Sequence, residues 1–147
     1  MLIRDALEKD IDDLMAIEEL CYDHPWPQEA FAQEIEQEEV GIGMVAEDEG
    51  HIVGYVTGMV MADEFHIHNI AVHPDYRGHG IGRRLMEAVE EMCARKEFRR
   101  MVLEVRKDNE SARKLYLSRG FEAVGTRKDY YGPGQDAHLY SKHLGAQ

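Results

Sequence analysis

One stretch of the sequence decides the fold, because three alternating glycines join a strand-like run to a long amphipathic pattern. It reads His73-Pro74-Asp75-Tyr76-Arg77-Gly78-His79-Gly80-Ile81-Gly82-Arg83-Arg84. The run before it, Phe65 to Val72, has the character of a strand, and Pro74 must end regular strand pairing. After the glycines, apolar residues recur at helical spacing at Ile81, Leu85, Ala88, Val89 and Met92. The stretch therefore predicts a strand, a glycine loop and a long helix, in that order.

The same signals extend outward in both directions. Strands are expected at residues 2–6, 43–47, 51–61, 65–72, 101–105, 122–127 and 137–144. Asp10 is expected to cap a helix with apolar positions Ile11, Leu14, Met15, Ile17 and Cys21, and further helices are expected at 29–37 and 109–118. A hairpin loop is expected at Asp48-Glu49-Gly50. The pattern predicts an α/β (α+β) fold with a mixed central sheet of about six to seven strands flanked by about four helices.

Composition limits the possible classes of function. The 147 residues carry a net charge of −12, and 44% of them are hydrophobic, which fits one domain spanning residues 1–147. The acidic balance argues against nucleic acid as a partner, because affinity for nucleic acid comes largely from neutralising phosphates. Cys21 and Cys93 are far apart in sequence and form no CxxC pair, which favours reduced thiols in a cytoplasmic protein. No export signal or membrane span is expected.

The glycine loop has the features of an anion site. Gly78, Gly80 and Gly82 lack Cβ atoms and allow backbone N–H groups to converge on a ligand, next to the positive end of a helix dipole. Arg77, with Arg83 and Arg84 beyond the glycines, adds cationic donors. The spacing fits neither a Walker loop nor a Rossmann fingerprint. From these residues alone, an ordinary glycine-rich turn with solvated arginines remains the alternative to a diphosphate site.

The motif Arg77-Gly78-His79-Gly80-Ile81-Gly82 resembles the Q/R-x-x-G-x-G/A signature of the GNAT superfamily of acetyl-CoA-dependent N-acetyltransferases. Further segments resemble the RimI-type ribosomal-protein-alanine N-acetyltransferases: Pro25-Trp26, Asn69 to Val72, Leu103 to Arg106, Asn109, Ala112, Leu115-Tyr116, Gly120-Phe121 and Tyr130-Tyr131. The resemblance implies that acetyl-CoA lies where two parallel strands splay at a β-bulge. The implied cofactor-binding residues are Ile70, Ala71, Val72, Arg77, Gly78, His79, Gly80, Ile81, Gly82, Arg83, Asn109 and Tyr116.

Two residues are candidates for the proton transfers of acyl transfer. Glu104 is a lone carboxylate in the apolar run Met101 to Val105, where a charge is costly unless it is solvated or used, so it is the candidate general base. The alternative is a surface glutamate paired with Arg106. Asn109 and Tyr116 are 116 − 109 = 7 positions apart and share a helix face. The resemblance assigns Asn109 to the pantetheine region and Tyr116 to the thiol sulfur, whereas a helix N-cap and a core aromatic are the alternatives.

The resemblance also implies the acceptor. Trp26, Tyr130 and Tyr131 would flank the substrate mouth, and the acceptor would be a protein N-terminal amine, such as the alanine of a small-subunit ribosomal protein. Lysine or small-amine acetylation, or a non-catalytic acyl-CoA sensor, are alternatives.

His68 stands where an apolar residue is frequent in the family. His66 and His68 share a strand face but lack a third ligand at a recognisable spacing, so no metal is expected. Neither cysteine shows an activating neighbour for an acetyl-enzyme.

Overall fold

The structure, a computed structural model, describes residues 1–22, 25–36, 41–106, 109–130 and 132–144. The strands are β1 (Leu2–Asp5), β2 (Gly41–Asp48), β3 (His51–Met61), β4 (Glu64–Val72), β5 (Arg100–Arg106), β6 (Glu122–Arg127) and β7 (Ala137–His143). The α-helices are α1 (Ile11–Cys21), α2 (Gln28–Glu36), α3 (Ile81–Arg95) and α4 (Glu110–Ser118). All seven strands form one sheet in the order β1-β2-β3-β4-β5-β7-β6. The predicted mixed α/β fold is therefore confirmed.

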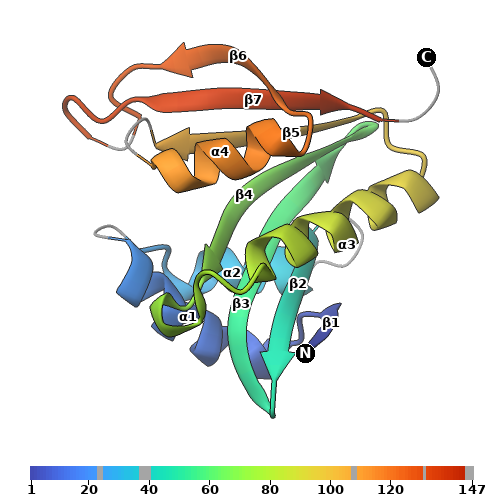
Figure 1. Cartoon of the computed structure of the whole chain (residues 1–147), viewed down its shortest axis with the longest axis vertical. Coiled ribbons are helices and arrows are strands. Elements are labelled where there is room, and N and C mark those ends of the chain that lie inside the picture. The colour runs from blue at the N-terminus through green and yellow to red at the C-terminus, as the bar shows by residue number, and fades with distance from the viewer. Residues whose placement is uncertain (23–24, 37–40, 107–108, 131, 145–147) are drawn as a thin grey trace.

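The sheet separates two layers of helices. Figure 1 shows α3 and α4 in front of the sheet and α1 and α2 behind it. Because successive side chains of a strand point to opposite faces, neighbouring residues enter different cores. Met44 and Val56 pack in the core that contains α3, whereas Val45 and Tyr55 pack in the core that contains α1 and α2. Both faces of the central strands are thus covered by helices.

Local sequence patterns predicted the helices and strands closely, but the predicted capping bond of Asp10 was wrong. The strands 51–61 and 122–127 have the predicted bounds, and the other described boundaries differ by at most two residues. Position 37 of the predicted second helix lies outside the described residues. Asp10 stands at the N-cap position of α1 but makes no side-chain cap bond there. Its carboxylate instead accepts hydrogen bonds from the Arg4 guanidinium and from the Leu7 backbone N–H. The positive charge of Arg4 makes its bonds stronger than a capping bond to a neutral N–H.

The central strands β4 and β5 separate partway along their length. They pair in parallel from Glu64↔Arg100 to Ile67↔Leu103, and β4 continues to Val72 without that neighbour. On its other side, β4 has a bulge, because Gly58 pairs with Ile67 while Thr57 pairs with Asn69, which leaves His68 as the extra residue. Gly58 allows this close approach, since a Cβ there would lie 2.2 Å from the His66 carbonyl oxygen. A splay beside a bulge was the expected arrangement.

Within the described ranges, no helix combines the length and apolarity needed to cross a membrane.

Candidate active site

The glycine loop leads directly into the first turn of α3. Gly78 and Gly80 have φ angles of 84° and 77°, a backbone conformation that residues with a Cβ rarely adopt. Gly80 is the N-cap of α3, and no side chain caps this helix terminus. The N–H groups of the first turn therefore remain available as donors, at the positive end of a helix of 15 residues.

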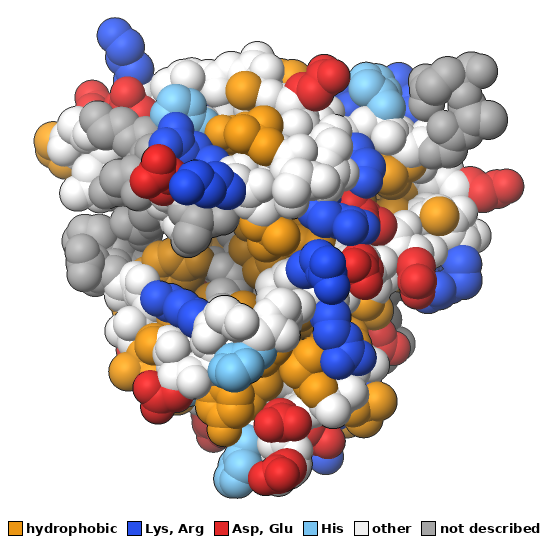
Figure 2. Space-filling view, in the orientation of Figure 1, with side chains coloured by type: hydrophobic (Ala, Val, Ile, Leu, Met, Phe, Trp, Pro, Cys, Tyr) orange, Lys and Arg blue, Asp and Glu red, His pale blue; other side chains and the backbone are white. Residues whose placement is uncertain are grey.

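A cavity of about 590 Å³ lies against this helix terminus and is named the loop cavity. Its lining consists of Cys21, Tyr22, Ile70, Ala71, Val72, Tyr76, Arg77, Gly78, Gly80, Ile81, Gly82, Arg83, Asn109, Ala112, Leu115 and Tyr116. Figure 2 shows a hollow on this face with a hydrophobic floor and a rim that includes Lys and Arg side chains. Uncapped amides beside an open cavity fit a diphosphate, with an apolar wall for the rest of a coenzyme. Of the residues predicted to bind a cofactor, His79 alone is not in this lining, and it is exposed.

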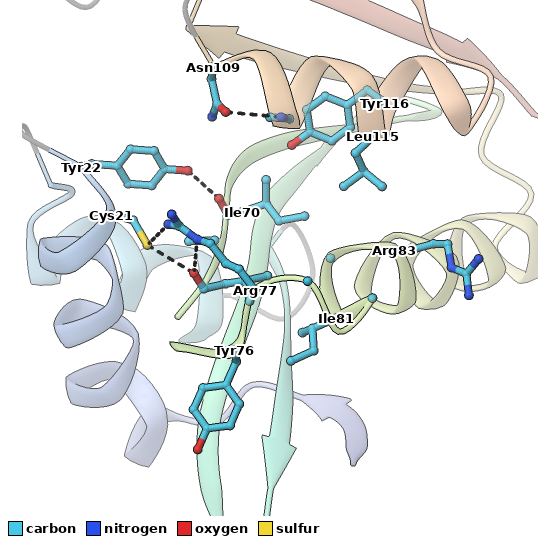
Figure 3. Close-up of a pocket in the computed structure, with 16 residues that line it drawn as sticks. Cys21, Tyr22, Ile70, Tyr76, Arg77, Ile81, Arg83, Asn109, Leu115 and Tyr116 are labelled. Carbon is cyan, nitrogen blue, oxygen red and sulfur yellow. Dashed lines mark hydrogen bonds between the residues drawn. The ribbon is translucent and has the colours of Figure 1, made fainter. Parts of the chain in front are cut away.

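Of the three arginines predicted as donors to phosphates, Arg77 and Arg83 point in different directions (Figure 3). The Arg77 guanidinium reaches back to the end of α1, where it donates from Nε to the Val72 carbonyl at 3.3 Å and from Nη2 to the Cys21 Sγ at 3.2 Å. Arg83 is exposed and lies 3.6 Å from Glu87, one helical turn along α3. The Arg77 and Arg83 guanidinium groups thus have partners away from the glycine turn, whereas the backbone amides of the first turn of α3 belong to it.

A second cavity, of about 300 Å³, lies where β4 and β5 separate and is named the splay cavity. Its lining consists of Glu18, Tyr22, Trp26, Ile67, His68, Asn69, Ile70, Glu104, Val105, Asn109, Ala112, Tyr116 and Tyr130. The two cavities share Tyr22, Ile70, Asn109, Ala112 and Tyr116 in their linings, so they meet at these residues. A ligand in the loop cavity can therefore present one end to a ligand in the splay cavity.

Glu104 lines the splay cavity from β5, a central strand between β4 and β7. Its carboxylate lies 3.3 Å from Nη1 of Arg127. The side chain of Arg106, its partner in the alternative interpretation, lies outside the described residues. Tyr130 also contacts this carboxylate. Burial and then the hydrogen bond to Glu104 raise the pKa of Tyr130, so its phenol stays protonated and donates to Glu104. Two donors thus orient the only glutamate that β5 contributes to the cavity.

Asn109 and Tyr116 both line the two cavities from one face of α4, and both also have the structural roles considered as alternatives. Asn109 is the N-cap, and its side-chain oxygen accepts from the Ala112 N–H at 3.3 Å. The Tyr116 ring is 2% exposed and packs against Phe121 and Tyr140. Of the residues predicted at the substrate mouth, Trp26 and Tyr130 line the splay cavity, whereas Tyr131 lies outside the described residues.

Sequence reasoning missed Glu18, which is 2% exposed at the base of the splay cavity. Its carboxylate accepts hydrogen bonds from the Tyr55 hydroxyl, from Asn69 Nδ2 at 2.7 Å and from the Trp26 backbone N–H at 2.9 Å. These bonds tie α1, β3 and β4 to the segment before α2. The available signal was its position in the sequence, because Glu18 follows Leu14 by four residues on the apolar face of α1.

Neither the histidines nor Cys21 forms a metal site or a reactive nucleophile in the described part of the chain. His68 bonds Glu34 of α2 and lines the splay cavity, whereas His66 bonds Glu64 on its own strand. In the described part of the chain, no group of three potential ligands could hold a metal ion. Burial raises the pKa of the Cys21 thiol although Arg77 opposes this shift, so the thiol is protonated at neutral pH. A protonated thiol is a poor nucleophile.

Comparisons with known proteins indicate the family and the fold. Residues 11–121 match the model of the acetyltransferase (GNAT) family. The N-alpha-acetyltransferase RimI of Mycobacterium tuberculosis is 38% identical over 134 residues, which cover 84% of this chain and 78% of that protein. The [ribosomal protein bS18]-alanine N-acetyltransferase of Escherichia coli is 33% identical over 115 residues, covering 78% and 76%. The crystal structure of the ribosomal-protein-S18-alanine N-acetyltransferase from Escherichia coli superposes with a TM-score of 0.91 at 28% identity, covering 99% and 95% of the two chains.

Proposed function

The chain belongs to the acetyltransferase (GNAT) family, and from this premise we propose that it transfers the acetyl group of acetyl-CoA to the α-amine of a protein N-terminus. The most specific form of the proposal is the N-terminal alanine of a small-subunit ribosomal protein. Relatives named for N-alpha or ribosomal-protein-alanine acetylation support it. The observation that carries it is the junction of the two cavities at Tyr116 and Ile70, with Glu104 on the splay side.

The loop cavity is the proposed site of the acetyl donor. The N–H groups of Gly78, Gly80 and the first turn of α3 would hold its diphosphate, and Leu115 and Ala112 provide apolar contact beyond them. When bound, acetyl-CoA supplies an activated thioester. The backbone of β4 near Ile70 to Val72 would polarise the thioester carbonyl, because this strand edge is not paired with β5.

The splay cavity is the proposed site of the acceptor. Glu104 would take a proton from the attacking nitrogen, directly or through water, and the Tyr116 hydroxyl would return a proton to the leaving sulfur. A peptide α-amine has a pKa near 7.7–8.0 and a lysine amine near 10.4, so the α-amine costs roughly 3.4 kcal/mol less to deprotonate. A single carboxylate base is therefore better matched to an α-amine.

The test combines binding with transfer. Calorimetry should detect acetyl-CoA binding, and a thiol-release assay should detect turnover with peptides that have a free first residue. A panel that varies this residue defines the preference, and the same panel includes free lysine and an N-terminally blocked lysine peptide. Turnover with the lysine substrates alone would support side-chain acetylation instead. Binding without turnover on any amine would contradict transfer.

A further inference from the structure

His68 and Glu104 face each other across the point where the central strands part. Ile67↔Leu103 is the last paired position of β4 and β5, so His68 and Glu104 are the next residues on the two strands. Residues at the same register position of parallel strands point to the same face of the sheet. Both side chains line the splay cavity. The bulge makes this placement possible, because His68 is its extra residue.

Each of these two side chains has its own orienting partner. Nδ1 of His68 bonds the carboxylate of Glu34, whose side chain is 3% exposed, and the Trp26 ring lies 5.9 Å from the imidazole. Glu104 is held by Arg127 and Tyr130. Since Glu34 occupies Nδ1, Nε2 is the nitrogen of His68 that remains for proton exchange. A carboxylate that orients an imidazole in a cavity is the arrangement of a general base and its positioning group.

The chemistry of the proposed reaction removes two protons from the nitrogen, which a second proton acceptor beside Glu104 would facilitate. An ammonium acceptor loses one proton before it attacks and a second after the C–N bond has formed. The C–S bond then breaks, the thiolate takes one proton from Tyr116, and one of the two protons taken from the nitrogen restores the Tyr116 phenol. The balance is an ammonium and a thioester giving an amide, a thiol and one proton released to solvent. Glu104 can hold one of the two nitrogen protons at a time.

We propose that His68, through Nε2, accepts one of the two protons that leave the acceptor nitrogen, with Glu34 as the residue that positions it. This inference rests on the proposed function, because it assigns a role within the same acceptor cavity. His68 and Glu104 then act from opposite strands on one nitrogen between them. Glu34 does not touch the substrate and acts only through His68.

The electrostatic surroundings of His68 define the pH range in which it can act. The bond to Glu34 raises its pKa most, burial opposes this, and the charges of Glu34 and Glu104 raise it further. The other ionisable groups lining the cavity are Glu18 and Tyr22 from the α1 side, Tyr116 from α4 and Tyr130 before β7, with Arg127 behind Glu104. The base form is the neutral imidazole, so activity should fall as the pH drops through a pKa above about 6.5.

The chain offers matched variants for a kinetic test. His68→Asn keeps an amide near the Nδ1 position and so preserves a partner for Glu34, but it removes the titratable ring. Glu34→Gln keeps a polar partner without the charge, which should lower the pKa of His68. His66→Gln is the control, because His66 is on the same strand and bonds a glutamate through Nε2 but does not line the cavity. Thermal unfolding and acetyl-CoA calorimetry check that each variant is folded.

The pH profile of kcat/KM on one peptide α-amine tests whether His68 accepts a proton from the acceptor nitrogen. We expect His68→Asn to lower kcat/KM at least tenfold and to remove one acidic limb, Glu34→Gln to move that limb to lower pH, and His66→Gln to match the wild type. Profiles of His68→Asn that superimpose on the wild type would overturn the inference. If the wild type acetylates no peptide α-amine, the proposed function fails instead, so the two failures are distinguishable.

A measurement on the unaltered protein covers the case in which a variant does not fold. Imidazole resonances of the wild type are followed by NMR as pH is varied, with coenzyme A and an acceptor peptide present or absent. The inference predicts that the peptide perturbs the His68 resonances and their titration more than those of His66. A His68 titration that is insensitive to a bound peptide would contradict it.

Discussion

The Tyr22 hydroxyl donates a 2.6 Å hydrogen bond to the carbonyl oxygen of Ile70, on the edge of β4 that no longer pairs with β5 (Figure 3). Because this strand edge is not paired with β5, we expect an amide of the pantetheine arm of bound acetyl-CoA to pair with it. The two donors would compete for one carbonyl. Tyr22→Phe should therefore tighten acetyl-CoA binding by about two- to tenfold, the equivalent of one hydrogen bond. Calorimetry on wild type, Tyr22→Phe and the control Tyr140→Phe, whose side chain lines neither cavity, measures this, and weaker binding by Tyr22→Phe would contradict competition.

Gly80→Ala tests the glycine loop. A Cβ at Gly80 meets nothing within 4 Å, so the cost is the positive φ of 77°, on the order of 1 kcal/mol of unfolding free energy. The loop should relax, and the acetyl-CoA Kd should rise about tenfold or more. Gly50→Ala is the matched control, because Gly50 has a φ of 83° and equal space in the β2–β3 turn, away from both cavities. Equal loss of stability with weaker binding only in Gly80→Ala is expected, and unchanged binding in both would count against the loop.

Glu104→Gln separates catalysis from binding. The amide keeps the size of the side chain and can still interact with Tyr130, but it cannot accept a proton at neutral pH. We expect kcat to fall by about 10²–10⁴ while the acetyl-CoA Kd changes less than twofold. Glu91→Gln, on the exposed side of α3, controls for the loss of one negative charge. Retention of wild-type kcat by Glu104→Gln would remove its role as base.

Tyr116→Phe tests the proton donor with little disturbance of the core. The ring packs against Phe121 at 5.8 Å and Tyr140 at 6.4 Å between ring centres, and phenylalanine retains both contacts. The unfolding free energy should change by less than about 1.5 kcal/mol, whereas kcat should fall at least tenfold. Denaturant unfolding and steady-state kinetics are measured together. A large loss of stability with unchanged kcat would leave only the structural role.

Acid should selectively remove the contribution of the Arg4–Asp10 pair to stability. Two bonds of 2.8 and 2.9 Å join these side chains, and the Arg4 bond holds the pKa of Asp10 below its usual range. A lowered folded-state pKa stabilises the fold fully above the unfolded value of about 3.9, and this contribution is lost as pH falls through the folded value. Asp10→Asn should cost about 2–3 kcal/mol at pH 7. In urea unfolding, the difference from wild type should shrink at pH 3, and a constant difference would contradict this.

The order of the elements and the loop could be predicted because their signals are local. Three glycines followed by apolar residues at helical spacing identify the start of α3, and the predicted loop Asp48-Glu49-Gly50 identifies the β2–β3 hairpin. The lone charge in the run Met101 to Val105 likewise placed Glu104 on a strand next to a cavity. In each case, neighbours in sequence are neighbours in space.

The contacts that shape the cavities could not be predicted, because they join residues far apart in the chain. Glu34 and His68 are 34 positions apart, Arg77 and Cys21 are 56 apart, and Glu18 and Asn69 are 51 apart. Residue types alone suggested that Arg77 would hold phosphate and that Asp10 would cap α1. Tertiary structure gave Asp10 another partner and directed the Arg77 guanidinium toward Cys21.

The central claim concerns which nitrogen receives the acetyl group, and one measurement tests it most directly. The purified protein is incubated with acetyl-CoA and a peptide that begins with a free alanine and contains one internal lysine, and the product is sequenced by tandem mass spectrometry. Acetyl on the alanine nitrogen, with the lysine unmodified, is the result predicted. Acetyl on the lysine side chain, or no acetylation by folded protein that binds acetyl-CoA, would contradict it.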